Sequence, residues 1–453
     1  MFKKIIYHAD EKQLTSKILL IVNLFFIFIY VYRTSQYLGS FIDEVVSLTS
    51  NYNFFTKLNY DASNLVDDFL GNYAANLSSG PLSAVGSVIG WGVSKNLLFA
   101  RLSNFIWLYS LLILFWIYTS KNYDIEKFTF LVYCSLALVI HPWWYGTLYS
   151  LGEAISTCVL FFGFLIFQKN RNLALLLISS SIILGKYINV LSFSFFYIYV
   201  IIREKSIKNI LNDAIIFLIP ITFWFSLIGL KHNGGILLWI KEAYEFQFLN
   251  NQSIGLNTSE GFNFESIVTR FNNSEVVNWN VSDFLRVLVI PGLLIGLLFF
   301  KNLFKNKILR ATINPIIFST IPIYLWFWLS STTKWIRYSQ NFLLLGLLTI
   351  IFCISYKRNL TVFEVIYSSI VFSVFLSSNV LFITFYILSI LIFIIFFKKL
   401  NTKNVNLFIL IFLLISLVNS TYEIIEKEKR IFNMEKCKIE LNSKDCFESY
   451  MDN

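Results

Sequence analysis

Three acidic residues of this sequence stand where a carboxylate could do chemistry. Asp43 and Glu44 form a pair in FIDEVVSLTSNYN, a few residues after a long apolar run, and Glu153 opens another apolar run after HPWWYGTLYSLG. A charge at the centre of a bilayer costs about 2.5–3.5 kcal/mol on insertion scales, so carboxylates beside apolar runs need a reason to be there. A partly desolvated carboxylate can accept the proton of an attacking hydroxyl. Asp43, Glu44 and Glu153 are therefore candidate catalytic residues.

Basic residues occur at comparable points of the chain. Lys186 lies in GKYIN, Lys334 and Arg337 lie in STTKWIRYSQ, and Arg101 lies in LLFARLSNF near the start of an apolar run. Lys334 and Arg337 share a face if their segment is helical. The planar fork of arginine matches two phosphate oxygens, whereas lysine is a mobile point charge. The sequence thus predicts a phosphate clamp of Lys186, Lys334 and Arg337, with Tyr338 beside it and Arg101 reaching the same interface.

Other interpretations of these groups stay open. The carboxylates of Asp43, Glu44 and Glu153 could together hold Mg²⁺ or Mn²⁺, which prefer oxygen ligands. Zinc is not expected, because no His or Cys accompanies them. The acidic pair could instead be a solvated helix N-terminus. Lys334 and Arg337 could simply anchor the chain among lipid head groups.

The rest of the chain is typical of membrane-spanning helices. Of its 453 residues, 56% are hydrophobic and only 14% are charged. Apolar runs recur that are close to the roughly 20 residues a helix needs to cross about 30 Å of hydrocarbon. We expect an all-α polytopic membrane protein with about 13 transmembrane helices. The predicted spans are 18–37, 98–119, 128–145, 154–168, 172–186, 188–202, 212–230, 284–300, 312–330, 341–356, 361–377, 380–397 and 405–420.

Charge sets the expected orientation. The formal net charge of +10 is spread over short loops between apolar runs, which is typical of membrane topology and not of nucleic-acid binding. Placing the N-terminus in the cytoplasm puts most short basic loops there too. The long connections 38–97 and 231–283 and the candidate catalytic residues then lie outside. A bias toward Phe, Ile, Asn and Lys indicates an AT-rich genome, so we expect a bacterial inner membrane.

Two segments have a more specific prediction. Apolar residues recur at helical spacing around 41–48 and 64–73, so the connection 38–97 should hold two amphipathic helices along the interface. The acidic pair stands at the start of the first. The stretch 171–205 is basic at both ends and too long for one span, so we expect a break at 185–187.

The same topology predicts where the cysteines lie. An odd number of spans puts the tail 421–453 outside, where Cys437 and Cys446 either form a disulfide or stay reduced. The other three cysteines lie in predicted spans and are expected to be inert packing residues.

The N-terminal half resembles the GT-C superfamily of integral-membrane glycosyltransferases, which use polyprenyl-phosphate sugars. The resemblance rests on the acidic pair after the first span, the outer loop leading to SSGPLSAVGSVIGWG, the arginine of LLFARL, the acid of GEAIST and the lysine between two short spans. The KWIRY segment adds to it. It defines a GT-C-like module over 1–210, followed by C-terminal transmembrane helices in 211–420 and the short outer tail 421–453.

The resemblance implies a membrane hexosyl- or pentosyltransferase with a polyprenyl-phosphate sugar donor. The acceptor would be a lipid or glycan at the outer face, and membrane lipids rather than nucleic acid would be the other partners. An aspartate of the first outer loop would be the catalytic base, a role that falls on Asp43 with Glu44 as the nearest substitute. A single displacement would invert the anomeric centre.

Two other functions fit parts of the pattern. A transporter or flippase of a lipid-linked saccharide would also need cations at the outer rim, but it should show polar residues in mid-membrane and often repeat symmetry. An O-antigen polymerase or ligase would share the many spans and basic outer loops. The early, acid-bearing outer loop favours the glycosyltransferase.

Overall fold

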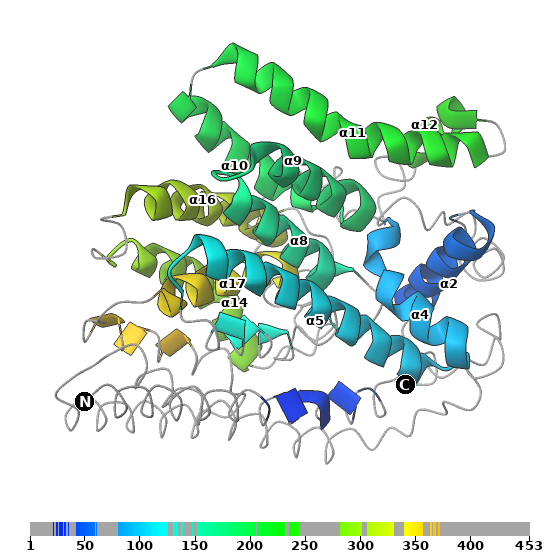
Figure 1. Ribbon diagram of the computed structural model, residues 1–453, viewed down its shortest axis with the longest axis horizontal. Helices are drawn as coiled ribbons and strands as arrows, with labels where there is room; N and C mark the ends of the chain where they lie inside the picture. The colour runs from blue at the N-terminus through cyan, green and yellow to red at the C-terminus, as the bar shows by residue number, and fades with distance from the viewer. Residues whose placement is uncertain are drawn as a thin grey trace, which may run out of the picture.

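The computed structural model of the chain is an assembly of helices that lie side by side (Figure 1). The structure describes residues 42–58, 60, 80–125, 152–204, 206–231, 235–244, 281–300, 306–329 and 339–356, with scattered residues of 21–35, 130–147 and 363–371. Within this part of the chain the backbone is helical and forms no strand. An isolated antiparallel bridge joins Ile125 to Tyr356.

Three of the described helices are long and apolar enough to cross a membrane: α5 (Leu97–Asn122), α11 (Ile207–Lys231) and α16 (Lys307–Leu329). At 1.5 Å per residue they measure roughly 34–39 Å, more than the hydrocarbon thickness of about 30 Å. These helices confirm the prediction of a helical, polytopic membrane protein. Both α11 and α16 begin earlier than predicted, because their first turns carry basic residues that can reach toward the head groups.

Shorter helices complete the described core. They are α8 (Glu153–Ile166), α9 (Arg171–Ser180), the π-helix η3 (Ser181–Gly185), α10 (Asn189–Glu204), α14 (Val281–Leu297) and α17 (Gln340–Ser355). Together with the three long helices they coincide with the predicted spans 98–119, 154–168, 172–186, 188–202, 212–230, 284–300, 312–330 and 341–356. The predicted spans 380–397 and 405–420 lie outside the described residues, and 18–37, 128–145 and 361–377 do so in part, so the expected number of spans stays a prediction.

The predicted break near Lys186 is present. Helix α9 continues into η3, the chain turns at Lys186, and α10 begins at Asn189. Gly185 sits where an added Cβ would lie 2.6 Å from the Cβ of Ser156, so only glycine allows this approach to α8. The turn is therefore held against the N-terminal part of α8.

The connection 38–97 holds helical structure beyond what we expected. Its first predicted amphipathic helix is α2 (Ile42–Lys57), which begins at the acidic pair, and the second, around 64–73, lies outside the described residues. The 3₁₀ turn η2 (Pro81–Ser83) and helix α4 (Val85–Ser94) were not predicted. Neither was α12 (Gly235–Tyr244) in the second long connection.

Glycines bring α4 close to α5. A Cβ on Gly90 would lie 2.1 Å from the carbonyl oxygen of Phe99, and a Cβ on Gly86 would lie 2.6 Å from the Cβ of Trp107. The Ser103 hydroxyl donates to the Gly86 carbonyl oxygen at 2.7 Å and accepts from the Gly90 amide at 3.0 Å. The small residues thus lower the helix propensity of α4 but let it pack tightly as an antiparallel partner of α5.

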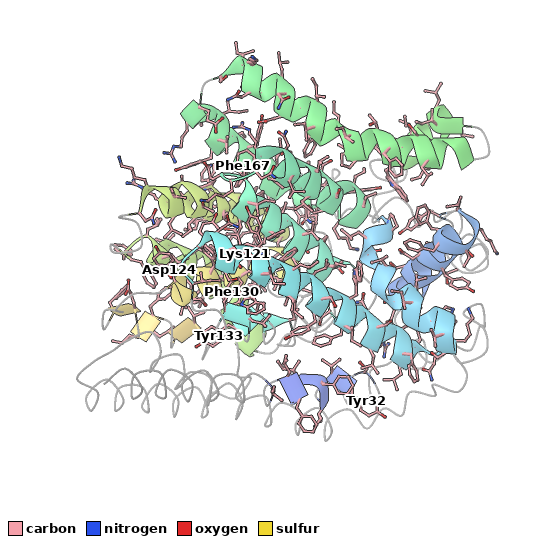
Figure 2. All side chains as sticks on the ribbon, in the orientation of Figure 1. Tyr32, Lys121, Asp124, Phe130, Tyr133 and Phe167 are labelled. Atoms are coloured by element: carbon pink, nitrogen blue, oxygen red, sulfur yellow. The ribbon has the colours of Figure 1, made fainter. Side chains whose placement is uncertain are left out.

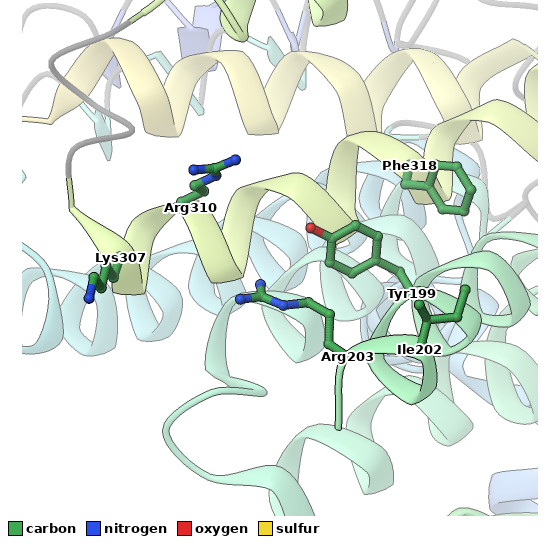
Figure 3. A pocket seen from close by; sticks show the side chains of 6 residues that line it. All are labelled: Tyr199, Ile202, Arg203, Lys307, Arg310 and Phe318. Atoms are coloured by element: carbon green, nitrogen blue, oxygen red, sulfur yellow. The ribbon is translucent and has the colours of Figure 1, made fainter. Parts of the chain in front are cut away.

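Helix α10 lies along α16 (Figure 3). The Ser192 hydroxyl donates to the carbonyl oxygen of Ser319 at 2.7 Å, and the Phe195 and Phe318 rings lie 5.5 Å apart. Helix α9 is joined in a similar way to α11, because the Ser179 hydroxyl donates to the carbonyl oxygen of Phe217 at 2.6 Å. These bonds join α10 to α16 and α9 to α11.

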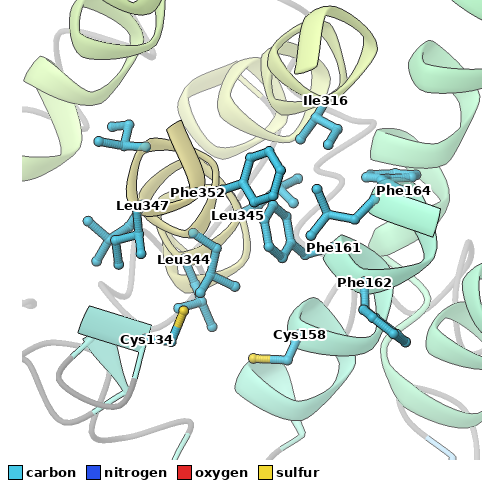
Figure 4. Close-up of a cluster of buried hydrophobic side chains, with 14 of the residues drawn as sticks. Cys134, Cys158, Phe161, Phe162, Phe164, Ile316, Leu344, Leu345, Leu347 and Phe352 are labelled. Atoms are coloured by element: carbon cyan, nitrogen blue, oxygen red, sulfur yellow. The ribbon is translucent and has the colours of Figure 1, made fainter. Parts of the chain in front are cut away.

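Side chains fill the space between the helices (Figure 2), and α8 and α17 form the centre of the core. Every residue of both helices is buried. Phe164 stacks on Phe196 with ring centroids 4.1 Å apart. Cys134 and Cys158 face this apolar cluster (Figure 4) and are buried, as is Cys353, in agreement with their expected packing role.

Candidate functional site

A buried ion pair joins the first connection to α5. The Arg101 Nε donates to Glu44 Oε1 at 3.0 Å and its Nη2 donates to Glu44 Oε2 at 2.7 Å, a bidentate pairing. The Arg101 Nη1 also donates to the carbonyl oxygen of Ser35 at 3.1 Å. Both side chains of the pair have 0% exposure. The pair fixes α2 against the N-terminal part of α5.

This geometry changes the expected place of Arg101. We expected its side chain to reach the interface, but it is fully buried, because Glu44 and Ser35 supply hydrogen-bond acceptors inside the protein. Asn96 caps α5 by accepting the Leu98 amide at 2.9 Å, which sets Arg101 on the second turn of this helix. Arg101 and Glu44 are thus partners of one another.

A second ion pair lies at the start of α8. Lys186 Nζ is 3.4 Å from Glu153 Oε1, and the two side chains are 17% and 5% exposed. Glu153 is the first residue of α8, where the helix dipole favours a negative charge. Its other oxygen, Oε2, is buried with no hydrogen-bond partner among the described residues. A buried carboxylate oxygen in this state can accept a proton or a hydrogen bond from a bound molecule.

Ser83 links the two ion pairs. Its hydroxyl lies 3.1 Å from that of Ser47, one turn along α2 from Glu44, and Asn51 Nδ2 donates to it at 3.4 Å. On its other side, Ser83 touches Gly152, the residue before Glu153. We name the site formed by Glu44, Arg101, Ser47, Ser83, Glu153 and Lys186 the carboxylate rim. The structure therefore brings Glu44, Arg101, Glu153 and Lys186 together at one end of the helices.

Gly152 is required at this contact. Its φ of +87° favours glycine, and an added Cβ would lie 2.4 Å from the Cβ of Ser83. We expect Gly152→Ala to lower the free energy of unfolding by at least about 1–2 kcal/mol, the cost of the left-handed conformation for a residue with a Cβ. The check is the thermal unfolding midpoint in detergent. Gly92→Ala is the matched control, because Gly92 lies on α4 with nothing within 4 Å of an added Cβ. This change should leave the thermal unfolding midpoint at or above the wild-type value.

The start of α17 reaches the same region. Asn341 Nδ2 donates to Asn189 Oδ1 at 3.0 Å, and the Asn189 amide donates to the Lys186 carbonyl oxygen at 3.1 Å. Ser339 and Gln340, which precede Asn341, are buried. Sequence reasoning missed both asparagines, and the only signal was that polar residues stand at the ends of two apolar runs.

Aromatic residues pack beside Lys186. Trp224 of α11 lies 5.4 Å from the Tyr60 ring and 5.6 Å from the Phe54 ring, measured between centroids. Tyr187 packs against this cluster. Removal from water raises the pKa of Tyr187 to about 12, so its phenol stays neutral at physiological pH. The region around Lys186 therefore offers one apolar, aromatic side.

Several predicted site residues lie outside the described part of the chain. The backbone of Asp43 belongs to α2, but its side chain is outside the description, as are Lys334, Arg337 and Tyr338 entirely. The cysteines of the expected tail disulfide, Cys437 and Cys446, are outside it too. Their roles stay predictions.

The expected Mg²⁺ or Mn²⁺ site also stays a prediction. Among the described residues no group of three His, Cys, Asp or Glu side chains could hold an ion. Glu44 is already engaged by Arg101, so an Mg²⁺ or Mn²⁺ site at this rim would depend on Asp43 and Glu153.

Comparison with known proteins adds to this picture. No family model and no curated protein sequence match the chain. Its fold is similar to those of two solved structures, and this likeness confirms the resemblance expected from the sequence at the level of the fold alone. The solved structures it resembles are of ArnT from Cupriavidus metallidurans, a GT-C glycosyltransferase.

The likeness extends over most of both chains at low identity. The apo state of ArnT aligns with a TM-score of 0.50 and 11% identity, covering 92% of this chain and 77% of ArnT. The form bound to undecaprenyl phosphate aligns with a TM-score of 0.52 and 11% identity, covering 91% and 76%. The two chains thus share their helical arrangement.

Proposed function

We propose that the protein is an inverting glycosyltransferase that moves a sugar from a polyprenyl-phosphate donor to a lipid or glycan acceptor at the extracytoplasmic face of a bacterial inner membrane. The observation that carries this proposal is the carboxylate rim, where Glu153 and its free oxygen lie beside Lys186. The fold supports it, since the similar structures include ArnT bound to undecaprenyl phosphate.

Asp43 is the proposed general base. It is four residues from Ser47 on α2, so the two positions share a face of the helix. Ser47 contacts Ser83, which in turn touches the residue before Glu153. The position of Asp43 on the Ser47 side of α2 supports this role, and the buried Glu44–Arg101 pair holds α2 in this register.

Lys186, Lys334 and Arg337 are the proposed ligands of the donor phosphate. Lys186 is partly exposed at the rim. Arg337 is four residues before Asn341, which is bonded to Asn189 in the Lys186 turn. Four residues extend over at most about 14 Å, so the chain is short enough between Asn341 and Arg337 for Arg337 to serve the same phosphate as Lys186. Fixed cations here would stabilise the phosphate as it leaves.

The proposed reaction is a single displacement. The acceptor oxygen forms a bond to the anomeric carbon, the bond from that carbon to the phosphate oxygen breaks, and its electron pair leaves with the lipid phosphate. The acceptor proton passes to the Asp43 carboxylate. Attack opposite the leaving group inverts the anomeric centre, as in inverting glycoside hydrolysis.

The test uses polyprenyl phosphate, the product that every sugar donor of this kind would release. We expect Lys186→Gln to bind undecaprenyl phosphate roughly tenfold to 100-fold more weakly than the wild-type protein, as a charge-assisted hydrogen bond contributes about 1.5–3 kcal/mol. Binding is measured by native mass spectrometry of the purified protein. Arg337→Ala should weaken binding in the same way, and Lys208→Gln, an exposed lysine on α11, is the control.

Undecaprenol lacks the phosphate, so its binding reports recognition of the lipid chain without recognition of the phosphate charge. It should bind the wild-type protein and Lys186→Gln equally. Equal binding of undecaprenyl phosphate by wild type, Lys186→Gln and Arg337→Ala would show that these residues do not hold the donor phosphate. Movement of a lipid-linked sugar across the membrane without release of polyprenyl phosphate would instead favour a flippase.

A further inference from the structure

The helices have a second charged end, opposite the carboxylate rim. Helix α8 starts at Glu153 and ends at Ile166, and α9 starts at Arg171 and returns toward Lys186. Helix α10 then runs back to Glu204, which pairs with Arg171. Arg171 and Glu204 therefore lie at the end of the bundle away from Glu153 and Lys186.

A pocket of about 700 Å³ opens at this second end between α10 and α16 (Figure 3). Its lining residues are Tyr199, Ile202, Arg203, Lys307, Arg310 and Phe318. This volume is in the range of ordinary ligand sites. Three of the six lining side chains are cationic, and we name this cavity the basic pocket.

The positive charge of the basic pocket is not neutralised by the acids around it. Among the described residues, Arg203, Lys307 and Arg310 make no ion pair with a carboxylate. Glu204, which follows Arg203 on α10, and Asp213 of the neighbouring α11 both pair with Arg171.

Further contacts hold the Asp213 side chain in place. Tyr197 donates to Asp213 Oδ2 at 2.6 Å, and Arg171 Nε donates to Asp213 Oδ1 at 2.7 Å. Asp213 is 1% exposed, so it is enclosed in its own cluster and does not face the basic pocket. The surplus of charge between α10 and α16 is therefore open to an anion from outside the protein.

The start of α16 adds to this preference. Lys307 and Arg310 stand in its first turn, where the helix dipole favours a negative charge. Asn306 Oδ1 already accepts the Ile308 and Leu309 amides at 3.0 and 3.3 Å. An anion would therefore be held by the side chains and the dipole, and not by free backbone amides. In Figure 3 the Tyr199 ring lies on the Arg203 side of the pocket.

The surroundings of the basic pocket are apolar in the direction of the membrane. Ile202 is 65% exposed, and Ile198, one turn earlier on α10, is 46% exposed. Phe318 forms the inner wall on α16 and Leu325 continues the exposed apolar surface of that helix. A free inorganic anion would gain nothing from this surface, whereas lipid acyl chains would lie along it.

We infer that the basic pocket binds the head group of an anionic phospholipid, with the phosphate among Arg203, Lys307 and Arg310 and the acyl chains along α10 and α16. Basic pockets between membrane helices suit such head groups. The site is separate from the carboxylate rim and does not depend on the proposed function. A lipid bound in this pocket would hold the exposed surface of α10 and α16 in a membrane that contains anionic phospholipids.

The test compares lipids on the purified full-length protein by native mass spectrometry. We expect phosphatidylglycerol to bind more tightly than phosphatidylcholine of the same chains. Each cation near an anionic head group contributes about fivefold in affinity. Single changes Arg203→Gln, Lys307→Gln or Arg310→Gln should each lower phosphatidylglycerol affinity about fivefold, and the triple variant on the order of 100-fold.

Matched variants make the result specific. Lys208→Gln and Lys121→Gln remove exposed charges of α11 and α5 outside the pocket, and both should keep wild-type affinity for phosphatidylglycerol. The inference is overturned if the triple variant retains the preference for phosphatidylglycerol or if Lys208→Gln loses as much. Full competition by millimolar inorganic phosphate would also overturn it, since the site would then be one for a free anion.

Discussion

Asp43→Asn is expected to slow glycosyl transfer by about 10²–10⁴-fold, the contribution of a positioned general base. Asparagine keeps nearly the shape of aspartate but cannot take the acceptor proton. Asp43 is the second residue of α2, at the end of the helix that the Glu44–Arg101 pair holds in place. The measurement is the release of polyprenyl phosphate from a lipid-linked sugar by the purified protein.

Two controls separate loss of the base from loss of structure. The thermal unfolding midpoint and the binding of undecaprenyl phosphate should both stay at wild-type values in Asp43→Asn. Asp68→Asn changes another carboxylate of the same connection and should leave transfer unchanged. If Asp43→Asn is fully active while Glu153→Gln is inactive, the base is Glu153, whose free oxygen already lies at the rim.

Hydropathy predicted the helices of the core because nearly every residue of a membrane helix contributes to its apolar character. Helices α8 and α17 are largely apolar after their first turns and are buried throughout, so length and composition alone located them. The break at Lys186 followed from length as well, since Arg171 and Lys205 bound a stretch that one helix cannot cover.

Helix α4 was not predicted, because its own sequence does not favour a helix. Its sequence VGSVIGWGVS has the glycine content of a loop, and glycine lowers helix propensity by about 1 kcal/mol relative to alanine. The contacts of Gly86 and Gly90 with α5 outweigh that cost, but they depend on residues nine to 21 positions further along the chain. Tertiary packing, which a local pattern does not reveal, decides the structure here.

The sequence singled out the charged residues of the carboxylate rim but did not predict how they pair. Glu44 and Arg101 are 57 residues apart, and the sequence offered no sign that each is the partner of the other. Arg101 was therefore expected at the membrane interface, where a lone arginine would go. Ser47 and Ser83 carry no chemical signature at all, although the bond between them joins the two ion pairs. Their importance comes from position alone.

Breaking the Glu44–Arg101 pair from one side is expected to lower the free energy of unfolding by about 3–5 kcal/mol. Arg101→Met leaves the Glu44 carboxylate buried without its counter-charge, and Glu44→Gln does the same to the guanidinium. The measurement is equilibrium unfolding of the purified protein in mixed detergent. Lys121→Met, an exposed lysine at the other end of α5, is the matched control and should change this free energy by less than about 1 kcal/mol.

The double variant Glu44→Leu with Arg101→Met is expected to be much more stable than either single variant, because no buried charge is then left without a partner. Its transfer activity should nevertheless stay low, since α2 loses the bidentate contact that fixes the register of Asp43. Regained stability without regained activity is thus the signature of a positioning pair. Strictly additive losses in the double variant would mean that the two side chains are not coupled, and full activity would mean that the pair does not orient Asp43.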